Sequence, residues 1–106
     1  MIDIYVTFPN IKEAKKISRL LLENRLAACV NMFPINSMYW WQGKIADDKE
    51  IAALIKTRKK NFKKIESLVA KHHSYSAPCI IQLPVTLVYK PYKKWLYGET
   101  RRRKKD

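Results

Sequence analysis

The first residues of the chain alternate between apolar and polar side chains. The apolar members of this alternation are Ile2, Ile4, Val6 and Phe8. A period of two is typical of a β-strand with one buried face. Pro9 ends the strand, and Asn10 followed three residues later by Glu13 resembles a capping box, which marks a helix start. Apolar side chains then recur at helical spacing and predict a helix through about residue 24; they are Ile11, Ala14, Ile17, Leu20 and Leu21.

The middle of the chain predicts extended segments joined by a hairpin. Residues 26–30 form a short apolar run with small side chains at its centre, as in a buried strand. Residues 34–37, which begin with a proline, interrupt this run, and an extended segment resumes at 38–41. The interior has a glycine-bearing turn signal at 42–44, so we place the hairpin there. The next strand covers residues 50–57.

The last third of the chain predicts a helix, a strand and a short second helix. Apolar side chains recur at helical spacing from residue 62 to residue 72. Residues 79–83 form a fourth strand, which Pro84 ends. Pro91 near the start and Gly98 at the end bound a short final helix.

The predicted order is β-α-β-β-α-β with an extra C-terminal helix. This order is that of an α+β, ferredoxin-like sandwich, an antiparallel sheet with two helices on one face. We expect residues 1–100 to form a single domain and residues 101–106 to be a disordered basic tail. The strand order of this fold, 4-1-3-2, places Cys29 and Cys79 about 14 Å apart across three strand spacings. Both thiols should therefore stay reduced within one chain.

The chain carries a strongly uneven positive charge. Residues 1–50 hold seven Lys/Arg and six Asp/Glu, whereas residues 51–106 hold fifteen Lys/Arg and three Asp/Glu, within a net charge of +13. Such a field attracts polyanions such as RNA, anionic lipid or acidic proteins. The alternative is a solvated helix face and a tail that binds nothing.

Size and composition favour a cytoplasmic protein that neither spans nor enters a membrane. The 106 residues suffice for one domain with its own core. No stretch approaches the roughly 18 apolar residues of a membrane span, and the first residues lack the layout of a signal peptide. Two cysteines are too few for a disulfide scaffold, which favours a reducing compartment.

Several kinds of catalytic and binding motif are missing from the sequence. Two glycines in the whole chain exclude a glycine-rich phosphate loop. No CxxC, HExxH or carboxylate cluster is recognisable, which argues against a preformed zinc or magnesium site. The lack of a paired acid–base constellation argues against an enzyme. His72 and His73 are adjacent, so on a helix they would point about 100° apart and would not chelate one ion.

Several short sequence motifs of the chain resemble those of the CutA family of divalent-cation-tolerance proteins. The matching fragments follow one another in the family's order from about residue 3 to residue 97. They are Leu26-Ala27-Ala28-Cys29-Val30-Asn31, Ser37-x-Tyr39-x-Trp41-x-Gly43, Glu50, Ile55-Lys56-Thr57, His73-x-Tyr75-x-x-Pro78, Leu83-Pro84-Val85 and Tyr92-x-x-Trp95. The resemblance implies a ferredoxin-like subunit in a homotrimer, a link to copper or other divalent metals, and a likeness to the PII signalling trimers. It implies no enzymatic activity and no required cofactor.

Four positions depart from the family's pattern. Ser74 stands where the family commonly has proline, and Cys79 where it commonly has glutamate. Gln42 replaces a usual glutamate, and Val88 a usual glycine. The loss of two carboxylates disfavours a hard metal ion, whereas a thiol at position 79 favours a soft ion such as Cu(I).

Three sets of candidate residues follow. The candidate metal ligands are Cys29, Cys79 and His73; the candidate residues of a ligand cleft are Tyr39, Trp41, Lys56 and Tyr75; the candidates for the trimer interface are Trp40, Trp41 and Trp95. Each has a plain structural alternative. A cysteine in a small-residue strand is often a core filler, and a histidine at a helix end often caps it. Lys56 is either an anion holder or a solvated strand end.

The sequence also predicts that the chain self-associates. Two helices cover one face of a four-stranded sheet, and the alternation along residues 39–41 and 51–55 places apolar side chains on both faces. An uncovered apolar face usually marks an interface, and closed cyclic symmetry is its common solution. The number three comes from the resemblance.

Two alternatives to a metal-binding trimer remain open. One is a PII-like small-molecule or signalling trimer without a metal role. The other is a basic RNA-binding module that stacks bases on Tyr39, Trp40 and Trp41. No strand carries the RNP1 pattern, which argues against nucleic acid as a partner.

Overall fold

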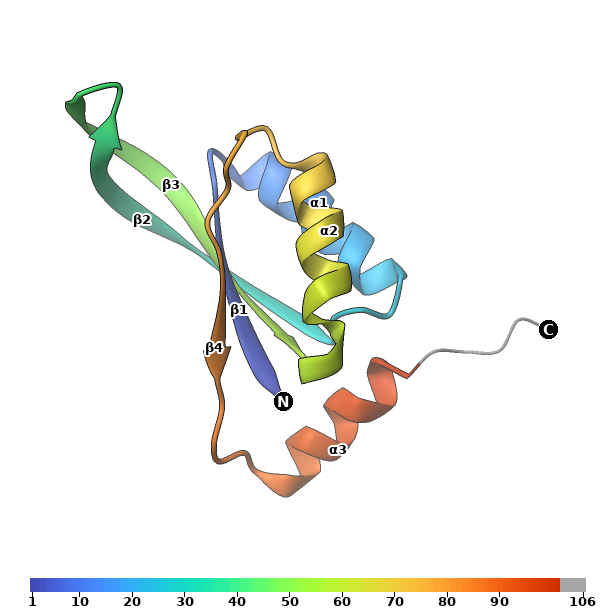
Figure 1. Ribbon diagram of the computed structural model, residues 1–106. Coiled ribbons are helices and arrows are strands. Elements are labelled where there is room, and N and C mark those ends of the chain that lie inside the picture. Colours follow the sequence, from blue (N-terminus) through green and yellow to red (C-terminus); the bar gives the residue numbers. More distant parts are fainter. Residues whose placement is uncertain (102–106) are drawn as a thin grey trace.

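The computed structural model describes residues 1–101 and contains one antiparallel sheet and three α-helices (Figure 1). The predicted basic tail, from residue 102 on, lies outside the described residues. The strands are β1 (Ile2–Phe8), β2 (Cys29–Trp41), β3 (Lys44–Thr57) and β4 (Ile80–Pro84). The helices are α1 (Ile11–Glu23), the short 3₁₀ helix η1 (Lys59–Asn61), α2 (Phe62–His72) and α3 (Lys90–Glu99).

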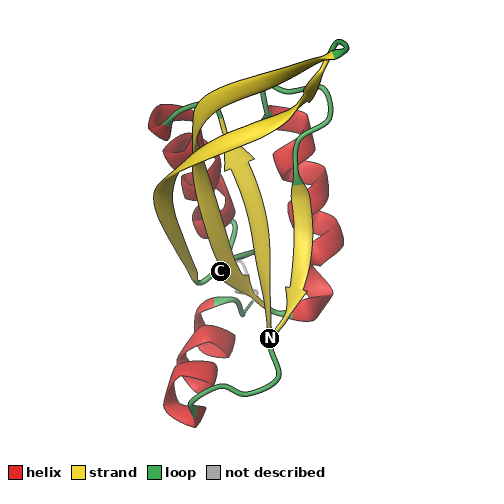
Figure 2. Cartoon of the chain, turned by 90° about the vertical axis from the view of Figure 1, so that its left-hand side faces the viewer, coloured by secondary structure: helices red, strands yellow, loops and turns green. Residues whose placement is uncertain are grey.

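The sheet has the strand order β2-β3-β1-β4, and every neighbouring pair is antiparallel. This order confirms the predicted α+β ferredoxin-like fold. Helices α1 and α2 both lie behind the sheet in Figure 2, so the opposite face carries no helix of this layer. Helix α3 lies at one end of the sheet, beside the N-terminus of β1 (Figure 2).

The core lies between the sheet and the two helices. Strand β1 alternates between buried and half-buried side chains along its whole length, as the period of two predicted. The register pairs Ile4 with Ile55 and Val6 with Ala53, which puts four buried side chains on the same face. Residues Ile17, Leu21, Ile65 and Val69 of α1 and α2 complete this core.

Both strands of the hairpin are longer than the sequence predicted. Strand β2 runs without a break from Cys29 through Pro34, and β3 begins at Lys44 rather than at residue 50. The expectation that residues 34–37 interrupt the strand was wrong because β2 is an edge strand. A proline is tolerated there when its missing N–H faces away from the partner strand.

The predicted turn at residues 42–44 is confirmed. Trp41 pairs with Lys44, which leaves a loop of two residues. Gln42 has a φ of 50° and Gly43 a φ of 77°. Positive φ at both central residues is the mark of a type I′ turn, whose twist matches that of the strands. The hairpin projects past the helices at one end of the molecule (Figure 1).

Helix α3 is fastened to the rest of the domain by Arg58. Its guanidinium lies 4.6 Å from the centre of the Tyr97 ring, donates to the Tyr97 carbonyl, and donates to Thr100 Oγ1 at 2.8 Å. A second contact is the ion pair between Arg25 and Glu99, at 2.8 Å. Leu96 on the inner side of α3 is fully buried.

None of the helices within residues 1–101 is long and apolar enough to cross a membrane.

The two cysteines lie at opposite corners of the sheet. Cys29 pairs with Lys56 in β3, Lys56 pairs with Asp3 in β1, and Asp3 pairs with Leu83 in β4. Three strand spacings therefore separate Cys29 from Leu83, about 14 Å. Cys79 lies four residues before Leu83, which adds an offset of about 13 Å along the strand. Both cysteines are free thiols.

We expect two free thiols in each chain. A disulfide tolerates Cα separations of only about 4.4–6.8 Å, far less than this geometry allows between Cys29 and Cys79. Thiol counting on the denatured, non-reduced protein should give two per chain. An intrachain Cys29–Cys79 peptide found by mass spectrometry would contradict the strand order.

Candidate functional site

A cluster of carboxylates and phenols lies at the base of the hairpin, on the sheet face that α1 and α2 leave uncovered. Tyr75 Oη donates to Glu50 Oε2 at 2.9 Å, and Tyr39 Oη donates to Asp48 Oδ2 at 2.5 Å. Asp48 and Glu50 share this face because they are two residues apart on β3. Tyr39 joins them from β2, since its neighbour on that face, Ser37, pairs with Asp48.

The environment keeps both phenols protonated. Burial and then the hydrogen bond to Glu50 raise the pKa of Tyr75 well above its ordinary value of 10.0. The hydrogen bond to Asp48 is the main cause that raises the pKa of Tyr39. Glu50 is only 8% exposed, so Tyr75 supplies the hydrogen bond that a nearly buried carboxylate requires. Each phenol therefore acts as a donor to a carboxylate at neutral pH.

Cys79 lies beside the same cluster. Burial and the negative charge of Glu50 both raise the pKa of its thiol. The thiol is consequently protonated near neutral pH and is a poor nucleophile. A soft metal ion that binds Cys79 must displace this proton. Cys79 is the predicted metal ligand that the fold brings next to Glu50.

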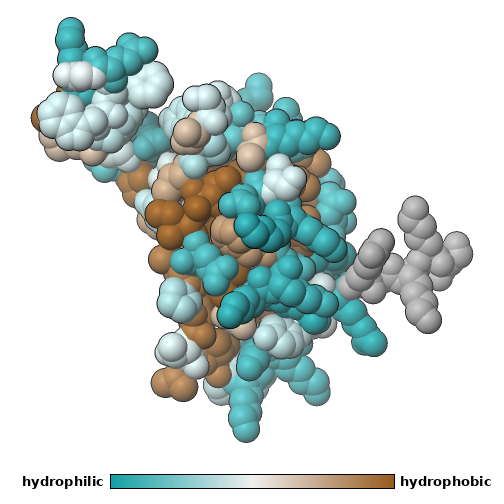
Figure 3. Space-filling view, in the orientation of Figure 1, coloured by the Kyte–Doolittle hydropathy of each residue, from teal (hydrophilic) through white to brown (hydrophobic). Residues whose placement is uncertain are grey.

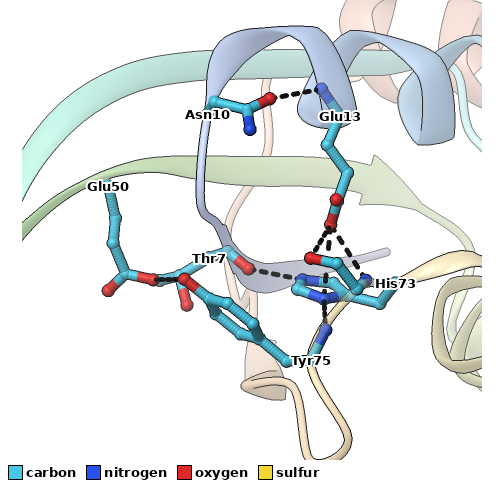
Figure 4. Close-up of polar contacts among 7 residues, drawn as sticks. Thr7, Asn10, Glu13, Glu50, His73 and Tyr75 are labelled. Carbon is cyan, nitrogen blue, oxygen red and sulfur yellow. Dashed lines mark hydrogen bonds and ion pairs between the residues drawn. The ribbon is translucent and has the colours of Figure 1, made fainter.

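His73 holds the loop that carries Tyr75 (Figure 4). The Tyr75 N–H donates to His73 Nδ1 at 3.0 Å, so Nδ1 has no proton and Nε2–H donates to the Thr7 carbonyl at 2.8 Å. The ring stacks on Phe8 with 5.1 Å between ring centres, and its side chain has no exposed area. Because both ring nitrogens are engaged, the predicted metal ligand His73 has no free lone pair in this conformation. The ring instead connects the C-terminal end of α2 to the backbone of Thr7 and Tyr75.

Glu13 ties the same loop to α1 (Figure 4). Its carboxylate accepts from the Ser74 N–H at 3.2 Å and from Ser74 Oγ at 3.0 Å, and it lies 3.4 Å from His73 Nδ1. The Glu13 N–H in turn donates to Asn10 Oδ1 at 2.9 Å, the N-cap bond that the sequence predicted. Ser74, which departs from the family's proline, thus supplies two donors that a proline could not.

A second polar group lies at the other end of the uncovered face, next to α3. Lys56 Nζ is 3.7 Å from Asp3 Oδ1, and both side chains are about one-fifth exposed. Asn31 Nδ2 approaches Cys29 Sγ at 3.8 Å, while burial and then the nearby Cys29 raise the pKa of Tyr92.

Cys29 and Lys56 are therefore distant from the cluster at the hairpin base. Lys56 is six residues from Glu50 along β3, a distance of about 20 Å. Of the predicted cleft residues, the structure brings together Tyr39 and Tyr75. Lys56 does not join them within one chain, and Trp41 lies towards the tip of the hairpin.

The three tryptophans are all accessible. Trp40 is 75% exposed and Trp41 59% exposed, and as neighbours on a strand they point to opposite faces of the hairpin. Trp95 is 45% exposed on α3, with its ring 5.5 Å from that of Tyr92. Exposed apolar side chains also follow the uncovered face of the sheet: Phe33, Ile81 and Leu83. Figure 3 shows hydrophobic atoms gathered along the β4 edge.

Within residues 1–101 no group of three or more His, Cys, Asp or Glu side chains is placed to hold a metal ion. One chain therefore offers at most part of a ligand set, with Cys79 beside Glu50. The sequence analysis missed Asp48 and Glu13 as site residues, and it noted Glu50 only for its resemblance. Starting β3 at Lys44 would have placed Asp48 and Glu50 on one face by simple alternation.

Comparisons with known proteins agree with this architecture. A family model described as CutA1 divalent ion tolerance protein matches residues 2–99. The divalent-cation tolerance protein CutA of Archaeoglobus fulgidus is 44% identical over 93 residues, which are 88% of this chain and 91% of that protein. Protein CutA, chloroplastic, of Arabidopsis thaliana is 40% identical over 101 residues, 94% of this chain and 56% of that protein.

A solved structure agrees as well. The structure described as the periplasmic divalent cation tolerance protein CutA from Archaeoglobus fulgidus matches with a TM-score of 0.93 at 41% identity, covering 94% of this chain and 98% of that one. Fold and site together define a ferredoxin-like α+β subunit with an uncovered sheet face. The chain belongs to the CutA family of divalent-cation tolerance proteins, which confirms the resemblance noted in the sequence.

The hydrogen bond between Tyr75 and Glu50 should contribute measurably to stability. We expect Tyr75→Phe to lower the free energy of unfolding by about 1–3 kcal/mol, because a nearly buried carboxylate loses its donor. Tyr39→Phe is the matched control and should lose less stability, because Asp48 is exposed and water can donate the hydrogen bond that the Tyr39 phenol gave. Urea unfolding of both variants measures the difference. Equal losses in the two variants would show that Glu50 does not depend on Tyr75.

Proposed function

We propose that the protein acts in divalent-metal tolerance as a homotrimer that binds metal at the boundary between subunits and catalyses no reaction. The single observation that carries this proposal is the uncovered sheet face, which holds both exposed apolar side chains and the cluster around Glu50. An apolar face of this kind is usually covered by another chain. The likeness to solved CutA structures supports self-association.

The uncovered face offers a continuous surface for a second copy. Ile81 and Leu83 of β4 and Phe33 of β2 are 38–49% exposed there, at opposite sides of the sheet. The hairpin extends beyond the helices and exposes Trp41 on the same face as Tyr39. A neighbouring subunit would cover these side chains and would enclose the cluster at the hairpin base. Closed cyclic symmetry allows three copies to do so in the same way.

We expect Ile81→Lys to break the assembly. A cation in the apolar centre of the interface would lose its hydration without gaining a partner. Light scattering at micromolar concentration should give three times the chain mass of 12.6 kDa for the native protein and a smaller mass for the variant. Gln82→Lys, one residue along β4 on the opposite face, is the matched control and should remain trimeric. A native protein that is monomeric under these conditions would refute the trimer.

The metal would be bound as cargo, with Cys79 as its thiolate ligand. A thiolate prefers a soft ion, so we propose Cu(I) ahead of Cu(II) and Zn(II). On binding, the sulfur–metal bond forms, the S–H bond breaks and the proton leaves to solvent. Glu50 would balance the positive charge of the ion. The remaining ligands would come from the adjoining subunit, because one chain supplies no complete set among residues 1–101.

We expect Cys79→Ser to weaken Cu(I) binding at least about tenfold. Loss of a residue that only orients a metal ligand typically costs about 10- to 100-fold in metal affinity, and loss of the ligand itself should cost no less. Calorimetric titration of the reduced protein with Cu(I), Cu(II) and Zn(II) measures the affinities. Cys29→Ser is the control, since Cys29 lies at the other corner of the sheet, and it should bind Cu(I) like the native chain. Unchanged Cu(I) affinity in Cys79→Ser would remove this thiol as a ligand.

A cytoplasmic location is part of the same proposal. Two free thiols fit a reducing compartment, where Cu(I) is the stable form of the metal. Related proteins are described as chloroplastic or periplasmic. Fractionation of the source cells with an antibody against this chain tests the location directly.

A small-molecule or signalling role like that of the PII trimers is the second candidate. The observation that favours it is the pairing of two phenols with two carboxylates, which offers hydrogen bonds rather than an open ligand set. This role would be favoured if the protein is trimeric and the calorimetric titration finds no affinity for Cu(I), Cu(II) or Zn(II).

A further inference from the structure

The exposed side of α1, η1 and α2, which we call the helical layer, carries most of the positive charge outside the tail. Its exposed cations are Lys12, Lys15, Lys16 and Arg19 on α1 and Lys59, Lys60, Lys63, Lys64 and Lys71 on η1 and α2. These nine cations face only three carboxylates on the same elements. Glu13 is engaged by Ser74, Glu66 lies 3.7 Å from Lys63, and Glu23 ends α1.

The cations form two rows on neighbouring helices. The row on α1 runs from Lys12 to Arg19, about 10 Å, and the row on α2 runs from Lys63 to Lys71, about 12 Å. Packed helices lie about 8–10 Å apart, so the rows form one broad surface. A shallow depression of about 480 Å³ follows α2 and is lined by Lys63, Lys64, Ser67, Leu68, Lys71 and His72. Figure 3 shows hydrophilic side chains gathered over α2.

We propose that the helical layer binds the phosphate backbone of a nucleic acid without reading its bases. Successive charges of one DNA strand are about 3.4 Å apart along the helix axis, so a 12 Å row of lysines spans about three phosphates. Backbone contacts from lysines carry no sequence information and need no aromatic side chains. The missing RNP1 pattern argues against base stacking on the strands and does not bear on this surface.

The composition of the layer favours a nucleic acid over a membrane. Proteins that lie on a membrane surface bury an apolar face, often with Trp or Phe, beneath their basic side chains. The large apolar side chains exposed on α1, η1 and α2 are Ile11 and Leu22, at opposite ends of α1. The exposed tryptophans lie on the hairpin and on α3 instead.

This surface is separate from the proposed metal site. The cluster around Glu50 lies on the opposite side of the sheet, so failure of metal binding would leave the helical layer unaffected. Association through the uncovered sheet face would leave α1 and α2 of every subunit pointing outwards. A trimer would then present three such surfaces, which strengthens binding to a long polyanion through multivalency.

The test is fluorescence anisotropy with the full chain and a labelled DNA duplex of about 20 base pairs, between about 50 and 200 mM salt. We expect Lys63→Gln/Lys64→Gln/Lys71→Gln to lose at least about tenfold in affinity at the lowest salt. The slope of log affinity against log salt should fall by about 3, because each lost phosphate contact removes about 0.9. Thermal melting and light scattering confirm that the variant keeps its fold and its assembly.

The matched control removes three charges elsewhere, in Lys44→Gln/Lys49→Gln/Lys90→Gln, and should keep nearly native affinity and slope. Equal losses in the two triple variants would overturn the proposal, because net charge alone would then explain binding. A third variant lacks residues 102–106. If this deletion abolishes DNA binding while the α2 triple variant binds like the native chain, binding belongs to the tail and the proposal is overturned. The proposal is also overturned if the native chain binds phosphatidylserine vesicles but not the duplex, or if the native chain does not bind the duplex at all.

Discussion

A four-stranded sheet has two faces, and the two packed helices of this chain cover only one of them. Strict alternation in β1 and β3 sends Ile4, Val6 and Ile55 towards the helices and sends their neighbours to the other side. The part of β1 and β3 that faces α1 and α2 is filled by apolar side chains of the core, so the polar side chains of the candidate site lie on the uncovered face. The carboxylate–phenol cluster, Cys79 and the exposed apolar side chains share that face for this single reason. The lysines of α1 and α2 face outwards on the far side of the molecule.

His73 was a candidate metal ligand, but in the structure its ring holds three segments of the chain together. Its ring accepts the Tyr75 N–H and donates to the Thr7 carbonyl, so it joins the end of α2, the following loop and the end of β1. Burial against Phe8 holds the ring in one orientation. The Tyr75 phenol is thereby placed over Glu50, so the geometry of the cluster depends on an imidazole whose hydrogen bonds go to the backbone of Thr7 and Tyr75.

The sequence was sufficient for the element order and the turn at Gly43, because these follow from periods of two and 3.6 and from one glycine. The strand order followed from matching that element order to the ferredoxin-like fold. The sequence failed at Pro34, where the edge position of β2 overrides the usual effect of proline on a strand. It also failed to pair Tyr75 with Glu50, which are 25 residues apart and meet only through tertiary structure. Lys56 and Tyr39 were grouped as one cleft, yet the strand direction separates them, since the hairpin base and the α3 end lie at opposite ends of β3. Local patterns predict which face a residue occupies but not how far along that face it lies.

The position of Cys79 beside Glu50 sets a condition on any metal chemistry at this site. The half-buried thiol of Cys79 next to a carboxylate is hard to ionise, since partial burial and the negative charge of Glu50 both raise its pKa. The positive charge that stabilises the thiolate must then come from the bound ion itself or, in the proposed trimer, from a cation of a second copy of the chain. Along β3, the cations of this face within residues 1–101 are Lys44 and Lys56; each lies six residues from Glu50, about 20 Å, and Lys56 is paired with Asp3. A single chain thus holds the thiol in its protonated form, and assembly or metal binding is what would supply the missing charge.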